Sequence, residues 1–262
     1  MERGIALRAR AVIRKPKAPR SQASDDLPSE VREVVSELIA SLGDDLTAVY
    51  WHGSEARAEA KPDSDHDLII VTKRLDDNLL LRMQGVFIGR ENWSTFVQTE
   101  EELRQFPSTG RLQFHFGLIP LYGRIEAPPF SRNDLSHDLR QLTLDIRFES
   151  RYRLFHREPD YGEMEVHYRD FLRARNARML RYAAKLAVLA LKARELLRGA
   201  SYPETREQLR KRLTDEDELA IVDVIDLWEE LRPKFEENAT ALALQLDAFA
   251  RKLVHELQMS RK

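Results

Sequence analysis

The spacing of hydrophobic residues changes near residue 130 and divides the chain into two regions. Before this point, short runs rich in β-branched and aromatic residues alternate with helical patterns, which is typical of a mixed sheet flanked by helices. Beyond it, hydrophobic residues recur every three or four positions, which predicts helices only. We therefore expect an α+β protein with a basic tail over residues 1–25, a first domain over 26–130 and a helical bundle domain over 131–262.

The first region reads as a series of short elements. An amphipathic helix of about fourteen residues should end at Gly43, because glycine is a good C-terminal cap. Residues 55–64 have the composition of a loop. The remaining patterns predict strands at 46–54, 67–71, 93–99 and 117–123 and helices at 75–86 and 100–106.

The second region contains four amphipathic stripes, which predict an antiparallel bundle. Gly199 should end the second helix, and the hydroxyl of Thr214 should cap a third helix that runs to Pro233. The stripes are formed by Leu135, Leu139, Leu142 and Ile146; by Met179, Tyr182, Leu186, Leu189, Ala193 and Leu196; by Ile221, Ile225 and Trp228; and by Phe235, Ala239, Leu242, Leu246, Phe249 and Leu253.

Composition excludes several classes of protein. The chain has no cysteine, which excludes disulfides, thiolate zinc sites and a cysteine nucleophile and fits a reducing cytoplasm. With 42 Lys and Arg against 44 Asp and Glu, the net charge of −2 gives no overall attraction to nucleic acid or to a membrane surface. No apolar run approaches the roughly eighteen residues of a membrane span. We expect a cytoplasmic protein in which any anionic partner would need a local patch.

Two basic segments are candidates for such a patch. The first twenty residues are rich in arginine and poor in acids, which favours a solvated tail over a transit peptide, a nucleic-acid arm or an added edge strand. A later helix face is also basic. Such a face is usually solvated, but one turned toward a cleft could bind phosphates or an anionic acceptor. The basic residues of this face are Arg173, Arg175, Arg178, Arg181 and Lys185.

Two carboxylates stand at the start of the second predicted strand. Because side chains alternate along a strand, Asp65 and Asp67 point the same way and His66 points the other way, where we expect it to be structural. Two carboxylates a few ångströms apart repel and do not both stay ionised without a counter-charge. A hard divalent cation would supply this counter-charge. Mg²⁺ or Mn²⁺ suits oxygen ligands and completes its shell with water and substrate phosphates.

Gly53 and Ser54 directly follow the first strand. A missing side chain lets backbone N–H groups approach an anion, and a hydroxyl can donate one more hydrogen bond, so this turn is a candidate phosphate cradle. Alone, a Gly-Ser pair at a strand end is usually a plain turn, and an Asp-x-Asp is usually a solvated loop. In this order, joined by a short loop and flanked by two strands, they are far more specific together.

The stretch from His52 to Val71 resembles the signature of the DNA polymerase β-like nucleotidyltransferase superfamily. The matching pattern is a strand ending in Gly-Ser, an Ala-Arg pair, and Ser-Asp-x-Asp-Leu opening the next strand. The all-helical second region is similar in architecture to the bundles that accompany aminoglycoside nucleotidyltransferases and minimal nucleotidyltransferases. The matching positions are Gly53, Ser54, Ala56, Arg57, Ser64, Asp65, Asp67 and Leu68.

The resemblance implies a chemistry. Asp65 and Asp67 would bind one or two Mg²⁺ ions that hold a nucleoside triphosphate such as ATP. Gly53 and Ser54 would hold its phosphates, and the motif also assigns Arg57 and Ser64 to nucleotide binding. An acceptor hydroxyl, on a small molecule, a protein or an RNA end, would attack the α-phosphorus and expel pyrophosphate.

The sequence departs from the family pattern in ways that leave the catalytic base open. The family carries a third carboxylate on the next strand, as metal ligand and general base, and Ser94 stands at that position here. A serine does not take up a proton near neutral pH. Glu91, three residues earlier, is our candidate base, and His115 is another. The family also often has glycine where Ala58 stands, a mild change if that backbone needs no positive φ.

Two rival functions follow from these departures. Ser94 supports a catalytically weakened fold kept as a nucleotide-binding or partner-binding module, such as an antitoxin-like or regulatory component. Arg151 and His156 match the Arg-x4-His pattern of HEPN ribonucleases, although a short pattern in so basic a chain arises easily by chance. A homodimer also stays open.

Overall fold

A four-stranded mixed sheet organises the first region of the computed structural model, which describes residues 27–61, 64–155 and 166–259. The strand order is β3-β2-β1-β4; β1 is antiparallel to β2 and β4, and β2 is parallel to β3. The predicted tail over residues 1–25 lies outside the described residues. The strands are β1 (Leu46–His52), β2 (His66–Thr72), β3 (Trp93–Thr99) and β4 (Ile119–Gly123).

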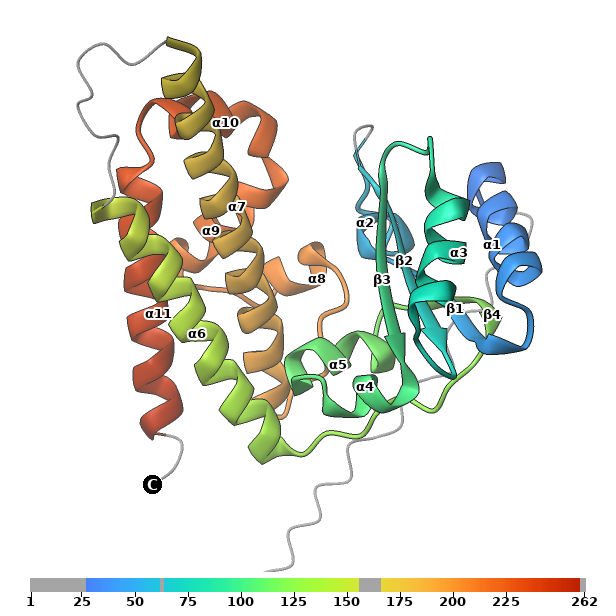
Figure 1. The fold of residues 1–262 in the computed structure, drawn as a ribbon. Coiled ribbons are helices and arrows are strands. Elements are labelled where there is room, and N and C mark those ends of the chain that lie inside the picture. Colours follow the sequence, from blue (N-terminus) through green and yellow to red (C-terminus); the bar gives the residue numbers. More distant parts are fainter. Residues whose placement is uncertain (1–26, 62–63, 156–165, 260–262) are drawn as a thin grey trace, which may run out of the picture.

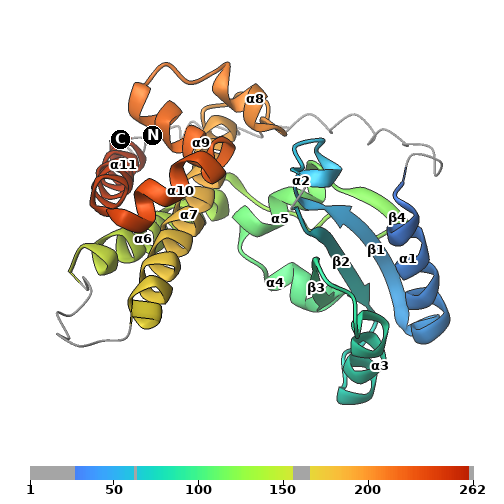
Figure 2. The same cartoon turned by 90° about the horizontal axis from the view of Figure 1, so that it is seen from above.

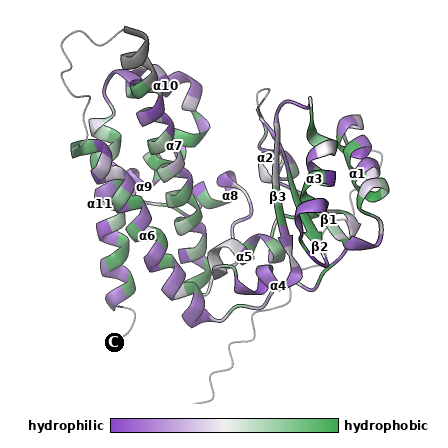
Figure 3. Ribbon diagram, viewed as in Figure 1, coloured by the Kyte–Doolittle hydropathy of each residue, from purple (hydrophilic) through white to green (hydrophobic). Residues whose placement is uncertain are grey.

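Helices cover both faces of this sheet (Figure 1). On one face, α1 and α3 pack against Val49, Leu68 and Ile70. On the other face, α4 and α5 pack against the alternate side chains of the same strands, such as Ile69. The hydrophobic residues therefore concentrate in the strands at the centre of the sheet (Figure 3). The helices and the short 3₁₀ turn of this region are α1 (Ser29–Leu42), η2 (Gly43–Asp45), α2 (Gly53–Ala56), α3 (Asp77–Phe87), α4 (Glu100–Gln105) and α5 (Ser108–His115).

The elements expected in this region are confirmed, and two short helices are additional. Each predicted strand and helix is present within a few residues of its expected bounds. The additional helices are α2, a single turn at Gly53, and α5, which was expected only as an apolar segment. The side chain of Leu112 on α5 belongs to the core of the second region, so this helix packs on both regions.

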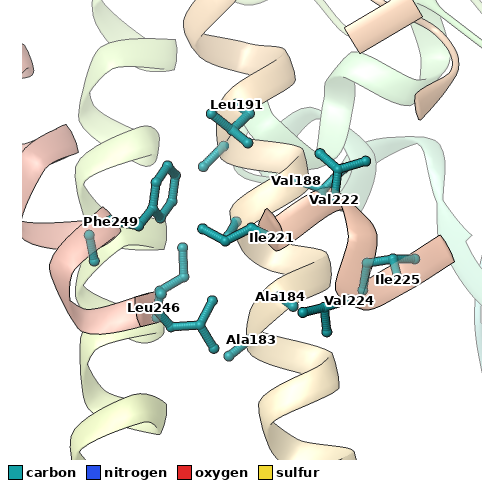
Figure 4. Packing of buried hydrophobic residues seen from close by; sticks show 14 of the residues in the cluster. Ala183, Ala184, Val188, Leu191, Ile221, Val222, Val224, Ile225, Leu246 and Phe249 are labelled. Atoms are coloured by element: carbon teal, nitrogen blue, oxygen red, sulfur yellow. The ribbon is translucent and has the colours of Figure 1, made fainter. Parts of the chain in front are cut away.

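The second region is all-helical, as predicted. Long helices α6, α7 and α11 pack together, and shorter helices complete the bundle (Figure 2). In the centre of the bundle, Leu246 and Phe249 of α11 meet Ala183 and Leu191 of α7 (Figure 4). The helices are α6 (Arg132–Phe155), α7 (Val166–Leu197), α8 (Arg206–Arg210), α9 (Glu216–Asp226), α10 (Trp228–Glu237) and α11 (Thr240–Met259).

Two details of the predicted bundle are wrong. Tyr182, assigned to the core stripe of the second helix, is 51% exposed, because small residues such as Ala183, Ala184 and Ala187 form the buried face instead. The third helix is not continuous, because it is interrupted at Leu227.

The caps of these helices also differ from the prediction. The side chain of Asp215, rather than Thr214, accepts hydrogen bonds from the first backbone N–H groups of α9. Pro233 lies inside α10 rather than at its end, and Phe235, expected to open the fourth helix, belongs to α10 as well. None of the helices in the described part of the chain has the length and hydrophobicity needed to cross a bilayer.

Candidate active site

The two predicted carboxylates lie at the edge of the sheet that faces the bundle. Asp67 is the second residue of β2 and is paired in register with His52 on β1 and Ser94 on β3. Its side chain lies on the same face of the sheet as Ile69, which packs toward α4 and α5, and Asp65 shares that direction. His66 points to the opposite face, where its Nδ1 lies 2.6 Å from a carboxylate oxygen of Glu55.

The glycine turn after β1 lies directly against Asp67. Gly53 has a φ of +79°, and a Cβ atom built on it would lie 1.8 Å from Oδ2 of Asp67. Any larger residue would push the carboxylate away, and it would also be strained in this left-handed conformation. The turn that is our candidate phosphate cradle therefore lies directly against one of the two predicted carboxylates.

The carboxylate pair has no counter-charge in direct contact. Burial, followed by the neighbouring charge of Asp65, raises the pKa of Asp67 to about 6, and a hydrogen bond from the Ser94 hydroxyl opposes part of this rise. Within the described ranges, neither Asp65 nor Asp67 forms an ion pair. Such a pair suits a divalent cation that binds through one or two carboxylates and takes its other ligands from water and phosphate. No group of three or more His, Asp or Glu side chains arranged for a metal was found among the described residues.

The charge of Lys185 on α7 acts on this carboxylate pair from the side of the bundle. Its pKa is lowered, first because surrounding protein removes water from the ammonium group and then because Arg181 is close, although the side chain still reaches solvent. Asp65 and Asp67 act on the same pKa in the opposite direction, so the three charges sense one another across the space between sheet and bundle. Lys185 is therefore placed to meet an anion bound at the carboxylates.

A second set of charges joins the two regions. Oε2 of Glu59 lies 3.0 Å from Nε of Arg57 and 3.2 Å from Nη1 of Arg206, and Oε1 accepts a hydrogen bond from the Arg206 backbone N–H. Arg206 also contacts Asp226 at 2.6 Å, and Nζ of Lys61 donates to the carbonyl of Asp226. We call these five residues the Glu59 clamp. It ties the loop after α2 to α8 and α9 of the bundle.

A buried lysine lies beside the clamp. Nζ of Lys192 donates to the carbonyl of Glu204 at 2.7 Å and lies over the ring of Tyr202. Burial, followed by repulsion from Arg57, lowers the pKa of Lys192 to about 8. Tyr202 in turn stacks on Phe116, with ring centroids 4.7 Å apart. These contacts hold α7 against the segment between α5 and β4.

The other residues predicted to bind the nucleotide are not all at the carboxylate pair. Ser54 lies in the first turn of α2, beside Gly53. Arg57 belongs to the Glu59 clamp, and its charge still acts on Asp67. The hydroxyl of Ser64 instead accepts a hydrogen bond from the Lys61 backbone N–H, so it stabilises its own loop.

Candidates for the catalytic base were Glu91 and His115. Glu91 is exposed in the turn before β3, at the same end of the sheet as Asp65, because β2 and β3 run parallel. Nε2 of His115 donates a hydrogen bond to the carbonyl of Pro128, and the ring packs against Phe130, which is a structural role. Ala58 has a φ of +55°, so this position does use the left-handed conformation that glycine adopts more easily.

Further aromatic and basic residues near the site or named above have structural positions. Tyr50 and Trp51 of β1 are buried in the sheet. His52 lies beside the carboxylate pair, and burial lowers its pKa to about 4, so the imidazole is neutral. Arg151 pairs with Asp247 at 2.7 Å, and its proposed partner His156 lies outside the described residues. The Glu59 clamp has no local sequence signal and was not predicted.

Several solved structures are similar to this chain, and one of them matches most of its length. The chain is similar to spectinomycin adenyltransferase AAD(9) from Enterococcus faecialis, solved with ATP and spectinomycin. The TM-score is 0.49, the sequence identity is 13%, and the match covers 86% of this chain and 98% of that chain. No protein-family model and no curated protein matches the chain. That protein is an adenyltransferase by name; at this level of similarity we take the function of this chain from its own residues.

Proposed function

We propose that this protein is a metal-dependent nucleotidyltransferase, which transfers a nucleoside monophosphate from a triphosphate to an acceptor hydroxyl. One observation carries the proposal. The carboxylates of Asp65 and Asp67 share a face at the sheet edge without an ion pair, and Gly53 is so close to Asp67 that no side chain fits between them. A divalent cation with a polyphosphate resolves the repulsion of such a pair.

Each residue of the site then has a role. Asp65 and Asp67 would hold Mg²⁺ or Mn²⁺, which when bound neutralises charge on the phosphates and orients them. The backbone at Gly53 and the hydroxyl of Ser54 would contact the phosphates of ATP or another triphosphate. Lys185 would approach the same phosphates from the bundle side, since it already senses both carboxylates. Arg57 would contribute its charge from the clamp.

The transfer itself needs little covalent chemistry from the protein. The acceptor oxygen forms a bond to the α-phosphorus, the bond from that phosphorus to the bridging oxygen breaks, and pyrophosphate leaves. The acceptor proton would pass to Glu91, the exposed acid at this end of the sheet. Positioning and charge neutralisation supply most of the rate.

The test is release of pyrophosphate from each α-labelled triphosphate in the presence of Mg²⁺ or Mn²⁺ and a panel of hydroxyl acceptors. We expect the Asp65→Ala/Asp67→Ala variant to lose at least about a thousandfold in rate, because several kcal/mol of charge stabilisation disappear with the metal. The matched control is Asp44→Ala/Asp77→Ala, which removes two exposed acids elsewhere on the sheet region. Equal activity in both double variants would eliminate the transferase.

Glu91→Gln is measured in the same assay. If Glu91 is the base, we expect the rate to fall by about a hundredfold or more with unchanged triphosphate binding. An unchanged rate would remove Glu91 from the mechanism while leaving the carboxylate site intact.

A second candidate is a nucleotide-binding module without turnover, and one observation favours it. Ser94 is paired with Asp67 in register and donates a hydrogen bond to it, so this position offers neither a third carboxylate nor a base. Metal-dependent triphosphate binding that requires Asp65 and Asp67, without pyrophosphate release for any acceptor, would decide for this module.

A further inference from the structure

The cations of α7 differ from those in the rest of the bundle. In the rest of the bundle, several arginines lie against carboxylates, such as Arg151 on Asp247 at 2.7 Å and Arg210 on Asp226 at 2.9 Å. Between Leu172 and Arg194, α7 has no acidic residue. Four cations of this stretch have no carboxylate within ion-pair distance anywhere in the described part of the chain. They are Arg175, Arg178, Arg181 and Lys185.

The geometry of the helix directs these cations toward the sheet. Lys185 senses Asp65 and Asp67, so its direction around α7 is the direction of the candidate site. At 3.6 residues per turn, Arg178 lies about 20° from Lys185 around the helix, and Arg175 lies about 80° away on the same side. The buried side chains of this helix, such as Leu180 and Ala183, occupy the opposite arc. Figure 2 shows α7 on the side of the bundle nearest the sheet.

These charges extend too far along the helix to serve one triphosphate. With a rise of 1.5 Å per residue, Arg178 stands about 10 Å from Lys185 along the axis, and Arg175 about 15 Å. A triphosphate held between Lys185 and the carboxylates does not reach two helical turns further. A longer anion that continues from the site along α7 would meet all three cations.

An exposed aromatic ring lies among the cations. Tyr182 is 51% exposed and lies about 60° from Lys185 around the helix, on the same side as Arg178. A cationic track with an exposed aromatic ring binds single-stranded nucleic acid, because phosphates pair with the cations and bases stack on the ring. The same face would repel a cationic acceptor such as an aminosugar. Arg181 adds to this field, with its guanidinium over the ring of Trp228.

We infer that α7 is an acceptor-binding surface for single-stranded nucleic acid, which lies along Lys185, Tyr182, Arg178 and Arg175. This inference rests on the proposed function and names its acceptor. The terminal hydroxyl of the strand reaches the carboxylate pair and attacks the α-phosphorus of the triphosphate. The bond to the bridging oxygen breaks, pyrophosphate leaves, and the hydroxyl proton passes to Glu91. The strand leaves one nucleotide longer.

The first experiment measures binding of a fluorescein-labelled single-stranded RNA by anisotropy, without metal or triphosphate, over a series of salt concentrations. We expect Arg175→Gln/Arg178→Gln to weaken binding at least tenfold and to flatten the plot of log K against log salt by about 1.4, because two phosphate contacts are lost. The control, Arg32→Gln/Lys73→Gln, removes two exposed cations of the sheet region, one on α1 and one directly after β2, and should leave binding unchanged.

Base stacking on Tyr182 distinguishes nucleic acid from other polyanions, because those have no bases. Tyr182→Ala should weaken binding about tenfold without changing the salt slope, and Tyr182→Phe should retain it, because the ring is kept. Single-stranded DNA in a parallel titration distinguishes the two kinds of strand. Absence of salt-dependent binding, equal weakening in the Arg32 and Lys73 control, or full binding by Tyr182→Ala overturns the inference. All variants change exposed side chains, and their thermal unfolding is compared with the wild type.

The second experiment separates this inference from the proposed function. An α-labelled triphosphate, Mn²⁺ and an RNA with a free 3′ hydroxyl should give labelled RNA, and a 3′-phosphorylated RNA should not. RNA binding at α7 with no transfer to any acceptor would defeat the proposed function and leave the surface intact. Transfer to a small cationic acceptor that is unaffected in Arg175→Gln/Arg178→Gln would defeat the inference and leave the transferase intact.

Discussion

Two groups of charged residues lie between the sheet and the bundle, and they differ in whether their charges form ion pairs. On one side, four of the five charges of the Glu59 clamp are paired: Glu59 with Arg57 and Arg206, and Arg206 with Asp226. On the other side, Asp65 and Asp67 have no ion pair within the residues the structure describes, and the same holds for four cations of α7, namely Arg175, Arg178, Arg181 and Lys185. Paired charges hold two bodies together, whereas unpaired charges of both signs are available to a metal and to phosphates. The paired charges therefore mark the part of the interface that positions the two regions, and the unpaired charges mark the part that is available to a metal and to phosphates.

Disturbing the unpaired side at Gly53 should have a larger effect than disturbing the paired side. Gly53→Ala places a methyl carbon 1.8 Å from Oδ2 of Asp67, which is far too close for either atom to stay in place. A displacement of the carboxylate by about 1 Å should lower the transfer rate by about a hundredfold. Metal-dependent triphosphate binding and pyrophosphate release measure this.

The control for Gly53→Ala is Gly89→Ala. Gly89 has a similar φ of +75°, but nothing lies within 4 Å of the added Cβ. Gly89→Ala introduces the same backbone strain, which lowers the free energy of unfolding by about 1 kcal/mol, but it introduces no contact with a carboxylate. If both variants lose activity equally, the close approach to Asp67 has no catalytic importance.

A smaller effect is expected from the paired side. Glu59→Gln removes the carboxylate between Arg57 and Arg206 and leaves Arg206 with Asp226 alone, so the free energy of unfolding should fall by about 2–3 kcal/mol. The loss of the fixed geometry should raise KM more than it lowers kcat. In a double-mutant cycle with Arg206→Gln, measured by urea unfolding, the two changes should be non-additive by about 1 kcal/mol or more.

A surface pair provides the comparison for the clamp. Glu101 and Arg104 lie 3.2 Å apart, but both are well exposed. Glu101→Gln should therefore change the free energy of unfolding by less than about 1 kcal/mol. Additive effects of Glu59→Gln and Arg206→Gln, of the same size as this surface change, would mean that the clamp does not hold the two regions.

The smallest effect is a pH dependence at Lys192, beside the clamp. Its pKa is lowered to about 8 in the folded protein. Between that pH and the ordinary lysine pKa of about 10.4, the unfolded chain binds the additional proton, so stability rises with pH in this window. The cost of burying the charge is fully present below pH 8 and is relieved above it.

The comparison is with Lys192→Met, which has no proton to release. We expect the free energy of unfolding of the wild type to rise by about 1–2 kcal/mol relative to this variant between about pH 8 and pH 9.5. The charged groups that act on the ammonium are Arg57, Arg206, Glu59 and Glu204. Parallel pH profiles in urea would show that Lys192 is not buried as the structure describes.

The sheet was predicted well and the bundle less well, for a physical reason. The third strand was expected at residues 93–99 and β3 spans Trp93–Thr99, because a strand is bounded by turn residues that are local. In the bundle, the hydrophobic stripe containing Tyr182 was chosen over the alanines that form the buried face. Alanine fits either a closely packed core or a solvated face, so its pattern does not reveal which side of α7 is inside.

The candidate site divides in the same way. The sequence by itself determined the glycine turn, the shared direction of Asp65 and Asp67, and Ser94 as the neighbour of Asp67, since alternation along strands and the Gly-Ser and Asp-x-Asp spacing are local properties. Only the tertiary structure decided that Lys185 faces those carboxylates and that Glu59 joins Arg206, two partners 147 positions apart along the chain. Charges that meet across two packed regions carry no periodic signal, because their distance depends on how the whole sheet docks against the whole bundle.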